Sequence, residues 1–372
     1  MEGKSGKNGV PADVSRIGFL PGDGIGPEVA WPARRCVEAV GAAVEWEKIS
    51  TTIKQTGAGR GMPAILLMAP IEGGYGRNGR NPLSDIKEAM AIHASVRRLR
   101  SFACGPGPAG GMDMLVIRPE GPPASFSREF RKGDPGWTAL PGACDDGATA
   151  ASLRFMNLRR SAEFFEFAFA LAQQAGRKKV TVAHRTNVFS VTDRDWLKCA
   201  EDVSRRFPGL ELEDQLVDYM AMQMARSPQR YDAVVVSELY GDIIGDLGVG
   251  LVGGLGMVPQ AYYGAKGTIF TTVHGTAPKY AGLERANPCA MILTASEMLG
   301  EIGEDGRGAL IVDAVRAAFE AGLRTPDLVA WPETGQAVGT GTFANAVLYN
   351  IKAGIGTPKG RPVIAGKGPE KG

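Results

Sequence analysis

Two aspartates in one short segment are the first candidates for chemistry in this sequence. Asp242 and Asp246 stand four residues apart in the segment SELYGDIIGD, which follows the apolar run 231–236. If a helix begins near Asp242, both carboxylates lie on one face and repel each other, and the helix dipole offsets part of that repulsion. A bound Mg²⁺ or Mn²⁺ would offset more, because hard cations take carboxylate oxygens as ligands. On spacing alone, a helix-capping aspartate beside a solvated one is the favoured alternative.

Asp218 shifts the balance toward a metal site. It is expected to end a strand over residues 210–217, and α/β proteins bind ligands where parallel strands end at one edge of the sheet. Arg97 and Arg118 are candidate anion ligands, because a guanidinium donates two parallel hydrogen bonds to a carboxylate. Each could instead be a surface charge, although Arg118 directly follows an apolar strand.

Two loops are rich in turn-forming residues. The segment PGDGIGP at residues 21–27 follows a strand over residues 16–20, but a proline replaces the third glycine of the G-x-G-x-x-G fingerprint. The simpler interpretation is a tight strand-to-helix turn that needs positive φ angles. The second loop, HGTAPKYAG at residues 274–282, contains a lone histidine, which by itself is more often structural.

The elements that would position these residues alternate between strand and helix. A capping box of Thr192 and Asp195 is expected to open one helix, and Gly176 is expected to end another. Helices are predicted over residues 28–40, 158–172, 192–206 and 220–226, and strands over 16–20, 180–183, 210–217 and 231–236. Such alternation predicts an α/β fold with a largely parallel sheet. Residues 73–81 and 119–146 are predicted to be loops, because both are rich in glycine or proline.

Composition limits the function classes. The chain has 372 residues, enough for about two domains, and 44% of them are hydrophobic. The net charge of +2 and the lack of a long apolar run indicate neither a nucleic-acid partner nor a membrane partner. Residues 1–15 are expected to be a disordered tail without the apolar stretch of a signal peptide. Five dispersed cysteines favour reduced thiols in the cytoplasm.

Five segments resemble those of isocitrate and isopropylmalate dehydrogenases, a family of β-decarboxylating dehydrogenases. They are IGFLPGDGIGPEV at residues 17–29, the segments around the three aspartates, HGTAPKYAG, and GTGTF at residues 339–343. The resemblance covers about residues 16–354. It implies two α/β domains with a largely parallel sheet. A nucleotide-binding domain would comprise residues 16–105 plus 253–372, and residues 106–252 would supply the metal ligands and the dimer contact.

The resemblance also implies ligands for a metal and a coenzyme. Asp242 and Asp246 of one subunit, with Asp218 of the other, would hold Mg²⁺ or Mn²⁺. The Lys279–Tyr280 pair resembles members that use NADP, because a cation there meets the 2′-phosphate. Ala286 and residues 325–328 resemble the NAD-using branch, so the signal is mixed and leans to NADP. The implied coenzyme-binding residues are His274, Gly275, Thr276, Ala277, Lys279, Tyr280 and Asn287.

The chain departs from the family where substrate and protons are handled. The family's substrate-binding helix carries serine, asparagine and arginine where this chain has Asn81, Leu83 and Lys87; the expected substrate-binding residues are Asn81, Lys87, Arg97 and Arg118. The family's tyrosine has no counterpart in residues 121–126, which leaves Ser125 as a weak substitute. Arg185 takes the place of the family's lysine. Arginine stays protonated and cannot act as a general base.

These observations leave three hypotheses open. The first is a metal-dependent, NAD(P)-linked oxidative decarboxylation of a substituted malate, with Arg185, Asp218 and Ser125 as the catalytic set and a homodimer as the assembly. The second is a catalytically impaired regulatory subunit of an isocitrate dehydrogenase-type oligomer, which the loss of both proton-transfer residues supports. A phosphate-binding scaffold is the third, and only the basic loop 77–80 favours it.

Overall fold

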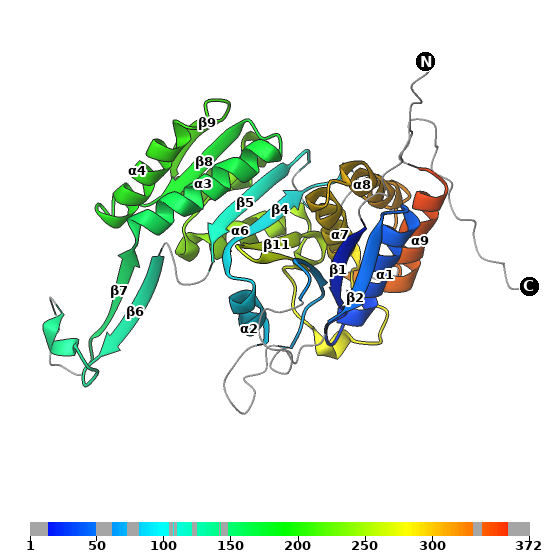
Figure 1. Ribbon diagram of the computed structural model, residues 1–372, viewed down its shortest axis with the longest axis horizontal. Helices are drawn as coiled ribbons and strands as arrows, with labels where there is room; N and C mark the ends of the chain where they lie inside the picture. Colours follow the sequence, from blue (N-terminus) through cyan, green and yellow to red (C-terminus); the bar gives the residue numbers. More distant parts are fainter. Residues whose placement is uncertain are drawn as a thin grey trace, which may run out of the picture. The chain divides into compact units, whose positions relative to one another are not determined.

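The computed structural model describes residues 14–49, 62–72, 82–103, 107, 110–120, 125–140, 142, 148–329 and 337–355. The chain forms two compact units (Figure 1). Unit 1 lies within residues 1–92, 101–110 and 252–372, and unit 2 within residues 93–100 and 111–251. The expected division placed residues 93–100 with the nucleotide-binding part. The structure differs because this segment pairs with a strand of unit 2 along its length.

Unit 1 is built on five strands in the order β2-β1-β3-β12-β11. All neighbours are parallel except β11 and β12, which form an antiparallel pair. The strands are β1 (Ser15–Leu20), β2 (Val44–Lys48), β3 (Ile65–Met68), β11 (Pro259–Gly264) and β12 (Gly267–Thr272). Parallel neighbours need helical crossovers, which explains why helix and strand alternate in the sequence of this unit.

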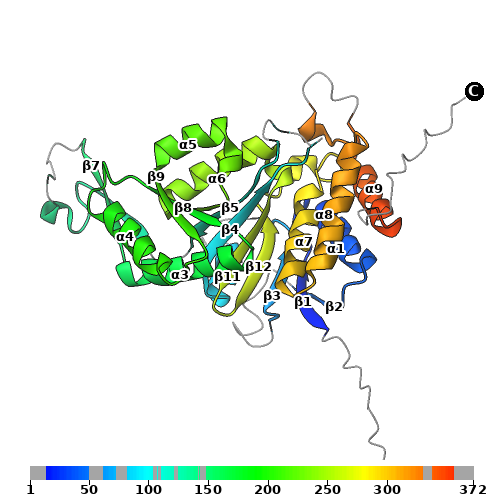
Figure 2. The same ribbon diagram turned by 90° about the horizontal axis from the view of Figure 1, so that it is seen from above.

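Helices cover both faces of the unit 1 strands. Four of them pack together on one face (Figure 2): α1 (Gly26–Ala39), α7 (Cys289–Glu301), α8 (Asp305–Glu320) and α9 (Thr340–Lys352). On the other face, Ile86 of α2 (Pro82–Ala89) packs into a cluster with Leu66 of β3 and Ile269 of β12. Helix α7 is buried around its whole circumference, so it forms the centre of this unit's core.

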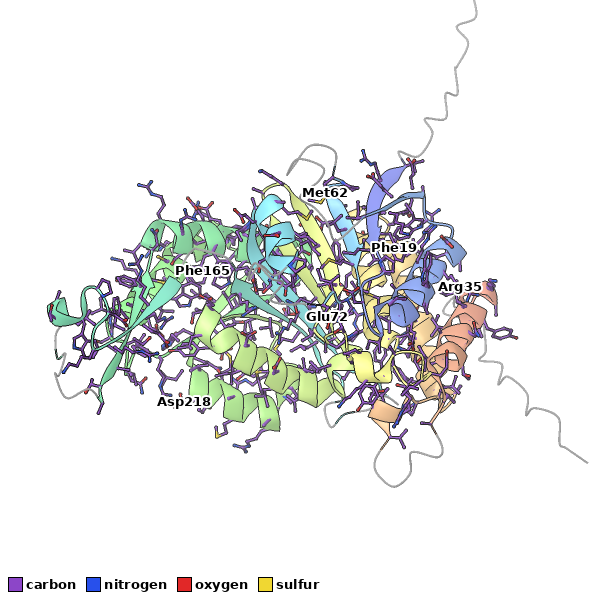
Figure 3. All side chains as sticks on the ribbon, turned by 90° about the horizontal axis from the view of Figure 1, so that it is seen from below. Phe19, Arg35, Met62, Glu72, Phe165 and Asp218 are labelled. Carbon is purple, nitrogen blue, oxygen red and sulfur yellow. The ribbon has the colours of Figure 1, made fainter. Side chains whose placement is uncertain are left out.

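Unit 2 contributes five strands in the order β4-β5-β10-β8-β9, parallel except for the β4–β5 pair. These strands are β4 (Ile92–Arg100), β5 (Asp113–Pro119), β8 (Lys179–His184), β9 (Glu211–Leu216) and β10 (Ala233–Val235). Helices α3 (Leu158–Gln174) and α4 (Thr192–Ser204) cover one face, and α5 (Val217–Arg226) and α6 (Glu238–Val252) the other (Figure 2). Phe165 of α3, shown in Figure 3, packs against Trp196 of α4 with 4.4 Å between ring centres.

A two-stranded ribbon also belongs to unit 2. Strands β6 (Ser125–Arg131) and β7 (Ala150–Met156) pair in an antiparallel arrangement. The prediction of a loop over residues 119–146 was therefore wrong for β6 and for the short 3₁₀ helix Trp137–Ala139. The near end of this ribbon pairs Arg131 with Ala150. Because the paired residues are far apart in sequence, no local sequence pattern predicts the two strands. The other predicted loop, residues 73–81, lies outside the described residues.

The fold class is confirmed, but three predicted boundaries need correction. Thr192 makes no capping hydrogen bond, and Val191 is the N-cap residue of α4. Helix α5 begins at Val217, so Asp218 lies in its first turn and not at a strand end. Helix α6 begins at Glu238, which places Asp242 in the second turn, beyond the strongest part of the helix dipole. Among the described residues, no helix has the length and apolarity that a membrane span requires.

Candidate functional site

The glycine-rich turn after β1 packs directly against the 274–282 loop in unit 1. Gly22 and Gly24 have φ angles of 77° and 58°, which confirms the prediction of a positive-φ turn. A Cβ on Gly24 would lie 2.1 Å from the Thr276 carbonyl oxygen. The Ile25 amide donates to this same oxygen at 2.9 Å. The turn therefore supports the second loop from beneath, and only a glycine fits at position 24.

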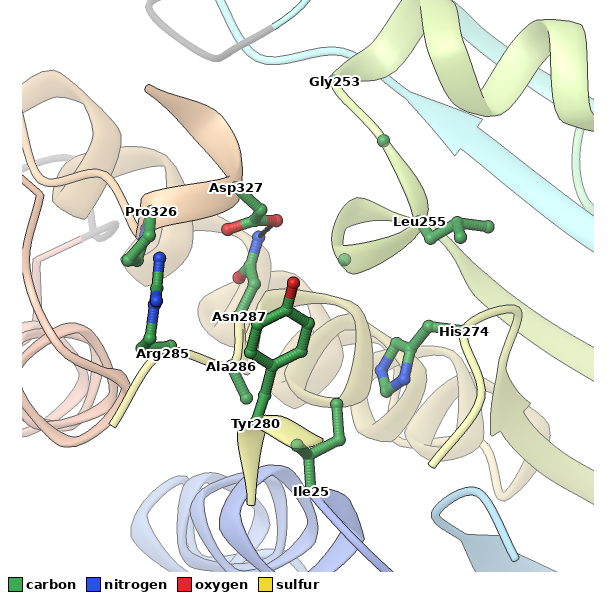
Figure 4. Close-up of a pocket in the computed structure, with 12 residues that line it drawn as sticks. Ile25, Gly253, Leu255, His274, Tyr280, Arg285, Ala286, Asn287, Pro326 and Asp327 are labelled. Atoms are coloured by element: carbon green, nitrogen blue, oxygen red, sulfur yellow. Dashed lines mark hydrogen bonds between the residues drawn. The ribbon is translucent and has the colours of Figure 1, made fainter. Parts of the chain in front are cut away.

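A pocket of about 430 Å³ opens beside this loop (Figure 4). It draws on the turn after β1, the segment between α6 and β11, the 274–287 loop and the segment before α9. Its lining residues are Ile25, Gly253, Gly254, Leu255, Gly256, His274, Tyr280, Arg285, Ala286, Asn287, Pro326 and Asp327. Of the predicted coenzyme residues, the lining includes His274, Tyr280 and Asn287. Gly275, Thr276, Ala277 and Lys279 belong to the same loop, outside this lining.

His274 presents a hydrogen-bond acceptor in this pocket. Its Nδ1 lies 3.1 Å from the Gly275 carbonyl oxygen, so Nδ1 must carry the proton. Burial lowers the pKa of the imidazole below its ordinary value, which favours the neutral ring. Nε2 is then an acceptor, and it is buried without a hydrogen-bond partner among the described residues. The ring can accept one N–H or O–H from a bound molecule.

The Asn287 side chain is committed to the protein. Its Nδ2 donates to Asp327 at 3.1 Å, and its Oδ1 accepts from the Cys289 amide at 2.9 Å. The second Asp327 oxygen accepts from Thr325 at 2.5 Å. Asn287 and Asp327 thus line one side of the pocket and hold each other in place by hydrogen bonds. Oδ1 can accept a second hydrogen bond, so the part of Asn287 in coenzyme binding stays a prediction.

Two cations flank the Tyr280 ring at the pocket rim. The Lys279 ammonium lies 5.1 Å from the ring centre, and the Arg285 guanidinium lies 5.7 Å from it. Within the described residues, neither cation forms an ion pair. Asp327 is an acidic residue of the same lining, and its hydrogen bonds from the neutral groups of Asn287 and Thr325 do not remove its charge. Arg285 was not among the residues predicted from the sequence, because it lies three residues beyond the end of the string HGTAPKYAG and belongs to no recognised motif.

In unit 2, Asp242 and Asp246 lie on one face of α6 and are both paired with arginine. Arg97 of β4 donates to Asp246 at 2.6 Å and lies 3.3 Å from Asp242. Arg118 at the end of β5 lies 3.0 Å from Asp242 and 2.5 Å from Glu120. The sequence had placed these groups more than a hundred residues apart, and the sheet brings them together.

The aspartates and the arginines differ in exposure. Each aspartate side chain is 63% exposed, whereas the Arg97 side chain is 10% exposed. The carboxylates therefore face solvent, and the largely buried guanidinium groups of Arg97 and Arg118 lie beneath them. Their oxygens are the donor type that Mg²⁺ and Mn²⁺ prefer, so this pair fits a divalent ion. Among the described residues of one chain, no group of three or more acidic, histidine or cysteine side chains could hold a metal.

Asp218 and Arg185 form an ion pair with each other. A hydrogen bond from Arg185 holds the pKa of Asp218 below its usual range, which keeps the carboxylate ionised. Asp218 lies at the exposed start of α5 (Figure 3). The segment with Arg185 follows β8, so Arg185 and the predicted metal ligand Asp218 stand side by side.

A buried carboxylate that sequence reasoning missed fixes this segment. Asp193, in the first turn of α4, accepts from the Arg185 amide at 2.7 Å and from Arg154 of β7 at 2.6 Å. The Tyr240 hydroxyl donates to it at 3.3 Å. The side chain is 1% exposed. Asp193 thus ties the ribbon, the end of β8 and α6 together, an arrangement that no local pattern predicts.

The substrate positions expected on α2 are only partly described. The Lys87 ammonium lies 3.6 Å from the ring centre of Tyr262, and Leu83 packs against the core cluster of this face. Asn81 and the side chain of Ser125 lie outside the described residues. Lys87 is thus packed over an aromatic ring, and its role as a substrate ligand stays a prediction.

The chain thus has an α/β fold, with a pocket beside the 274–282 loop in unit 1 and an arginine-paired carboxylate pair in unit 2. Residues 16–347 match the isocitrate/isopropylmalate dehydrogenase family, and the chain belongs to that family. It is 31% identical to a probable alpha subunit of mitochondrial NAD isocitrate dehydrogenase of Drosophila melanogaster, over 77% of this chain and 75% of that one. It is 31% identical to a mitochondrial NAD isocitrate dehydrogenase regulatory subunit of Dictyostelium discoideum, over 85% and 87%.

A solved structure agrees with the sequence relatives. The isocitrate dehydrogenase from Methylococcus capsulatus superposes with a TM-score of 0.75 and 28% identity, covering 91% of this chain and 99% of that chain. The resemblance inferred from the sequence is therefore confirmed. The family consists of decarboxylating hydroxy-acid dehydrogenases, which classes this chain with oxidoreductases.

Proposed function

We propose that this protein catalyses the metal-dependent, NADP-linked oxidative decarboxylation of a substituted malate. The observation that carries the proposal is the solvent-facing pair Asp242 and Asp246, which Arg97 and Arg118 hold in a member of this family. The carboxylate pair would take the divalent ion, and Arg118 would meet a substrate carboxylate at the same edge of the sheet. A bound divalent ion lowers the pKa of a hydroxyl and stabilises negative charge beside it.

The residues of the chain would supply binding and proton handling. Arg185 remains protonated, so it would orient the substrate oxygen and not remove its proton. Water or Asp218, which Arg185 keeps ionised, would accept the hydroxyl proton. Protonation of the carbon after loss of CO₂ needs a positioned acid, and Ser125 is a weak one. We therefore expect oxidation to be retained better than the final proton transfer.

A second copy of the chain would complete the site. Asp218 belongs to α5, and the side chains of Tyr219 and Met222 in the same helix are exposed. In α6, Leu239 and Ile243 are 55% and 66% exposed. Apolar side chains at this level of exposure on two adjacent helices favour burial against another protein surface. A homodimer that covers them would bring Asp218 of one copy toward the aspartate pair of the other.

NADP is favoured over NAD by the charge at the pocket rim. Lys279 and Arg285 offer two cations beside Tyr280, which suit a 2′-phosphate. An NAD-selective site would need an acidic acceptor for the ribose hydroxyls. Asp327, a carboxylate in the pocket lining, already accepts from Asn287 and Thr325, which leaves it fewer free lone pairs for a ribose hydroxyl.

The metal assignment is tested by Asp246→Asn. Removing a charged oxygen ligand should weaken Mn²⁺ binding by roughly tenfold or more in calorimetry. Asp202→Asn, in an exposed ion pair on α4, is the control and should leave Mn²⁺ binding unchanged. Equal Mn²⁺ affinity in wild type and Asp246→Asn would refute the assignment. Activity is tested with a panel of substituted malates, NAD or NADP, and Mn²⁺, by following the absorbance of the reduced nicotinamide.

A regulatory role in an oligomer is the second candidate. Arg185 in place of a base favours it, as does the similarity to a protein named for such a role. The double variant Arg185→Lys with Ser125→Tyr restores the family's pair. A rise in decarboxylating turnover would support an altered proton relay on a working scaffold. Nucleotide binding without turnover in either form would support the regulatory role.

A further inference from the structure

The turn that carries Arg185 is held by a carboxylate from the helix that follows it. One oxygen of Asp193 accepts from the Arg185 amide at 2.7 Å. The Arg185 carbonyl accepts from the amides of Val188 and Phe189, at 2.9 and 2.8 Å. The Asp193 amide donates in turn to the Phe189 carbonyl at 3.1 Å. The backbone on both sides of the Arg185 side chain is therefore fixed.

The second oxygen of Asp193 joins this turn to the two-stranded ribbon. It accepts from Nη1 of Arg154 at 2.6 Å. Arg154 lies in β7 opposite Ser127 of β6, and Ser125 is the first residue of β6. Arg185 and Ser125 are the positions at which the sequence departs from the family's proton-transfer pair. One carboxylate thus connects the two backbone segments that carry them.

An ionised carboxylate is a costly side chain to place here. The Asp193 side chain is 1% exposed, and burying a charged carboxylate is unfavourable unless it is paired and hydrogen-bonded. A neutral serine or asparagine could cap the helix, but each has only one side-chain oxygen. The carboxylate has two, one for the turn and one for the ribbon.

Arg185 is held at both ends. Its amide is bound to Asp193, and its guanidinium pairs with Asp218 at the exposed start of α5. The Asp218 side chain is 57% exposed and can exchange its partner for solvent or a ligand. Asp193 is buried and has access to neither, so the inner end of Arg185 is the fixed one.

We propose that Asp193 is a positioning residue for Arg185, because it fixes the backbone from which the guanidinium extends. The inference rests on the proposed function, in which Arg185 orients the substrate oxygen. Asp193 itself would touch neither the substrate nor the coenzyme. Since misplacement of an orienting group by about 1 Å can lower a rate by roughly a hundredfold, a small movement of the turn is enough to matter.

Asp193→Asn removes one of the two contacts, because an amide has a single acceptor oxygen. We expect turnover of the hydroxy acid to fall by roughly tenfold to a hundredfold. The KM for NADP should not change, since the nucleotide pocket lies in unit 1. Asp113→Asn is the matched control. It also replaces a carboxylate that pairs with arginines in unit 2, but at the opposite edge of the sheet, where β5 begins. This control should keep the wild-type turnover.

Removing the Arg185 side chain separates positioning from stability. In an Arg185→Ala background there is no guanidinium to misplace, so adding Asp193→Asn should lower turnover by less than about threefold. The loss of stability caused by Asp193→Asn, measured by urea denaturation, should be the same in both backgrounds. An equal loss of turnover in both backgrounds would mean that Asp193 acts through general stability, and the inference would be overturned.

The NMR signal of the Arg185 guanidinium gives a readout that does not depend on turnover. In the isotope-labelled full chain, the Nε–H resonance that disappears in Arg185→Ala belongs to Arg185. This resonance should shift or broaden in Asp193→Asn and stay in place in Asp113→Asn. An unchanged resonance in Asp193→Asn would also overturn the inference.

Two further outcomes are decided by the same measurements. If Asp193→Asn does not fold, hydrogen exchange of the Arg185 amide in the wild type provides the test, because a bond to a buried carboxylate protects the amide; rapid exchange would count against the inference. If the wild type turns over no hydroxy acid, the proposed function fails, while a shifted Arg185 resonance in Asp193→Asn still supports Asp193 as the residue that places Arg185.

Discussion

Gly24→Ala should damage the nucleotide loop more than the glycine's own conformation explains. Gly24 has a φ angle of 58°, and alanine in this left-handed region costs about 1–2 kcal/mol. The new Cβ would also stand 2.1 Å from the Thr276 carbonyl oxygen, where ordinary contact begins at 3.4 Å. The two segments must separate, which breaks the 2.9 Å hydrogen bond from Ile25 to the same oxygen. That bond contributes about 1 kcal/mol.

Gly41→Ala separates these two effects. Gly41 has a φ angle of 70° and meets nothing within 4 Å, so alanine there carries the conformational cost alone. We expect Gly41→Ala to lower the free energy of unfolding by about 1 kcal/mol, and Gly24→Ala by about 2–3 kcal/mol once the lost hydrogen bond is included. Urea denaturation of both variants measures the difference.

Coenzyme binding gives the sharper comparison. Because the turn supports the 274–282 loop, Gly24→Ala should weaken NADP binding by roughly tenfold, the equivalent of about 1.4 kcal/mol. Gly41→Ala lies after α1 and should bind NADP like the wild type. Calorimetric titration measures both affinities. If the two variants lose the same stability and bind NADP equally, the close approach of Gly24 to the loop has no energetic consequence and the reasoning is refuted.

Three further predictions concern charges. Lys279→Asp should weaken NADP binding and leave NAD binding within a few fold; equal losses for both coenzymes in calorimetry would make Lys279 a loop charge without a role in selectivity. Burial opposes the charge of Asp113, but Arg98 and Arg177 outweigh it and hold its pKa well below the usual range. Because the pKa of Asp113 is lower in the folded state than in the unfolded state, its ionised carboxylate stabilises the fold at pH values above the unfolded-state pKa. Asp113→Asn should therefore destabilise the protein at pH 7. The difference in the free energy of unfolding between this variant and the wild type, measured by urea denaturation, should shrink as the pH falls below about 4. A difference that does not depend on pH would contradict this prediction. Asp193→Asn should lower the free energy of unfolding by about 3 kcal/mol, because it weakens a buried ion pair and three hydrogen bonds; a loss under about 1 kcal/mol would argue against that.

The order of elements and the identity of the family could be read from the sequence. Apolar runs of strand length alternate with helix-period segments, and local strings such as HGTAPKYAG and SELYGDIIGD carry the resemblance. These signals are local, because periodicity and turn chemistry depend on neighbours in the chain. They sufficed for the fold class, the positive-φ turn at Gly24 and the choice of Asp242 and Asp246 as candidates.

The helix boundaries and the partners of each charge were decided by tertiary structure. Asp218 and Asp242 both sit within the first two turns of a helix, where the sequence pattern suggested a strand end and a helix start. The pairing of Arg97 with Asp246 spans 149 residues, and the sheet, not the sequence, brings them together. A Cβ on Gly245 would lie 2.6 Å from Nη1 of Arg97, and the local pattern around a glycine says nothing about which side chain will fill the space that it leaves.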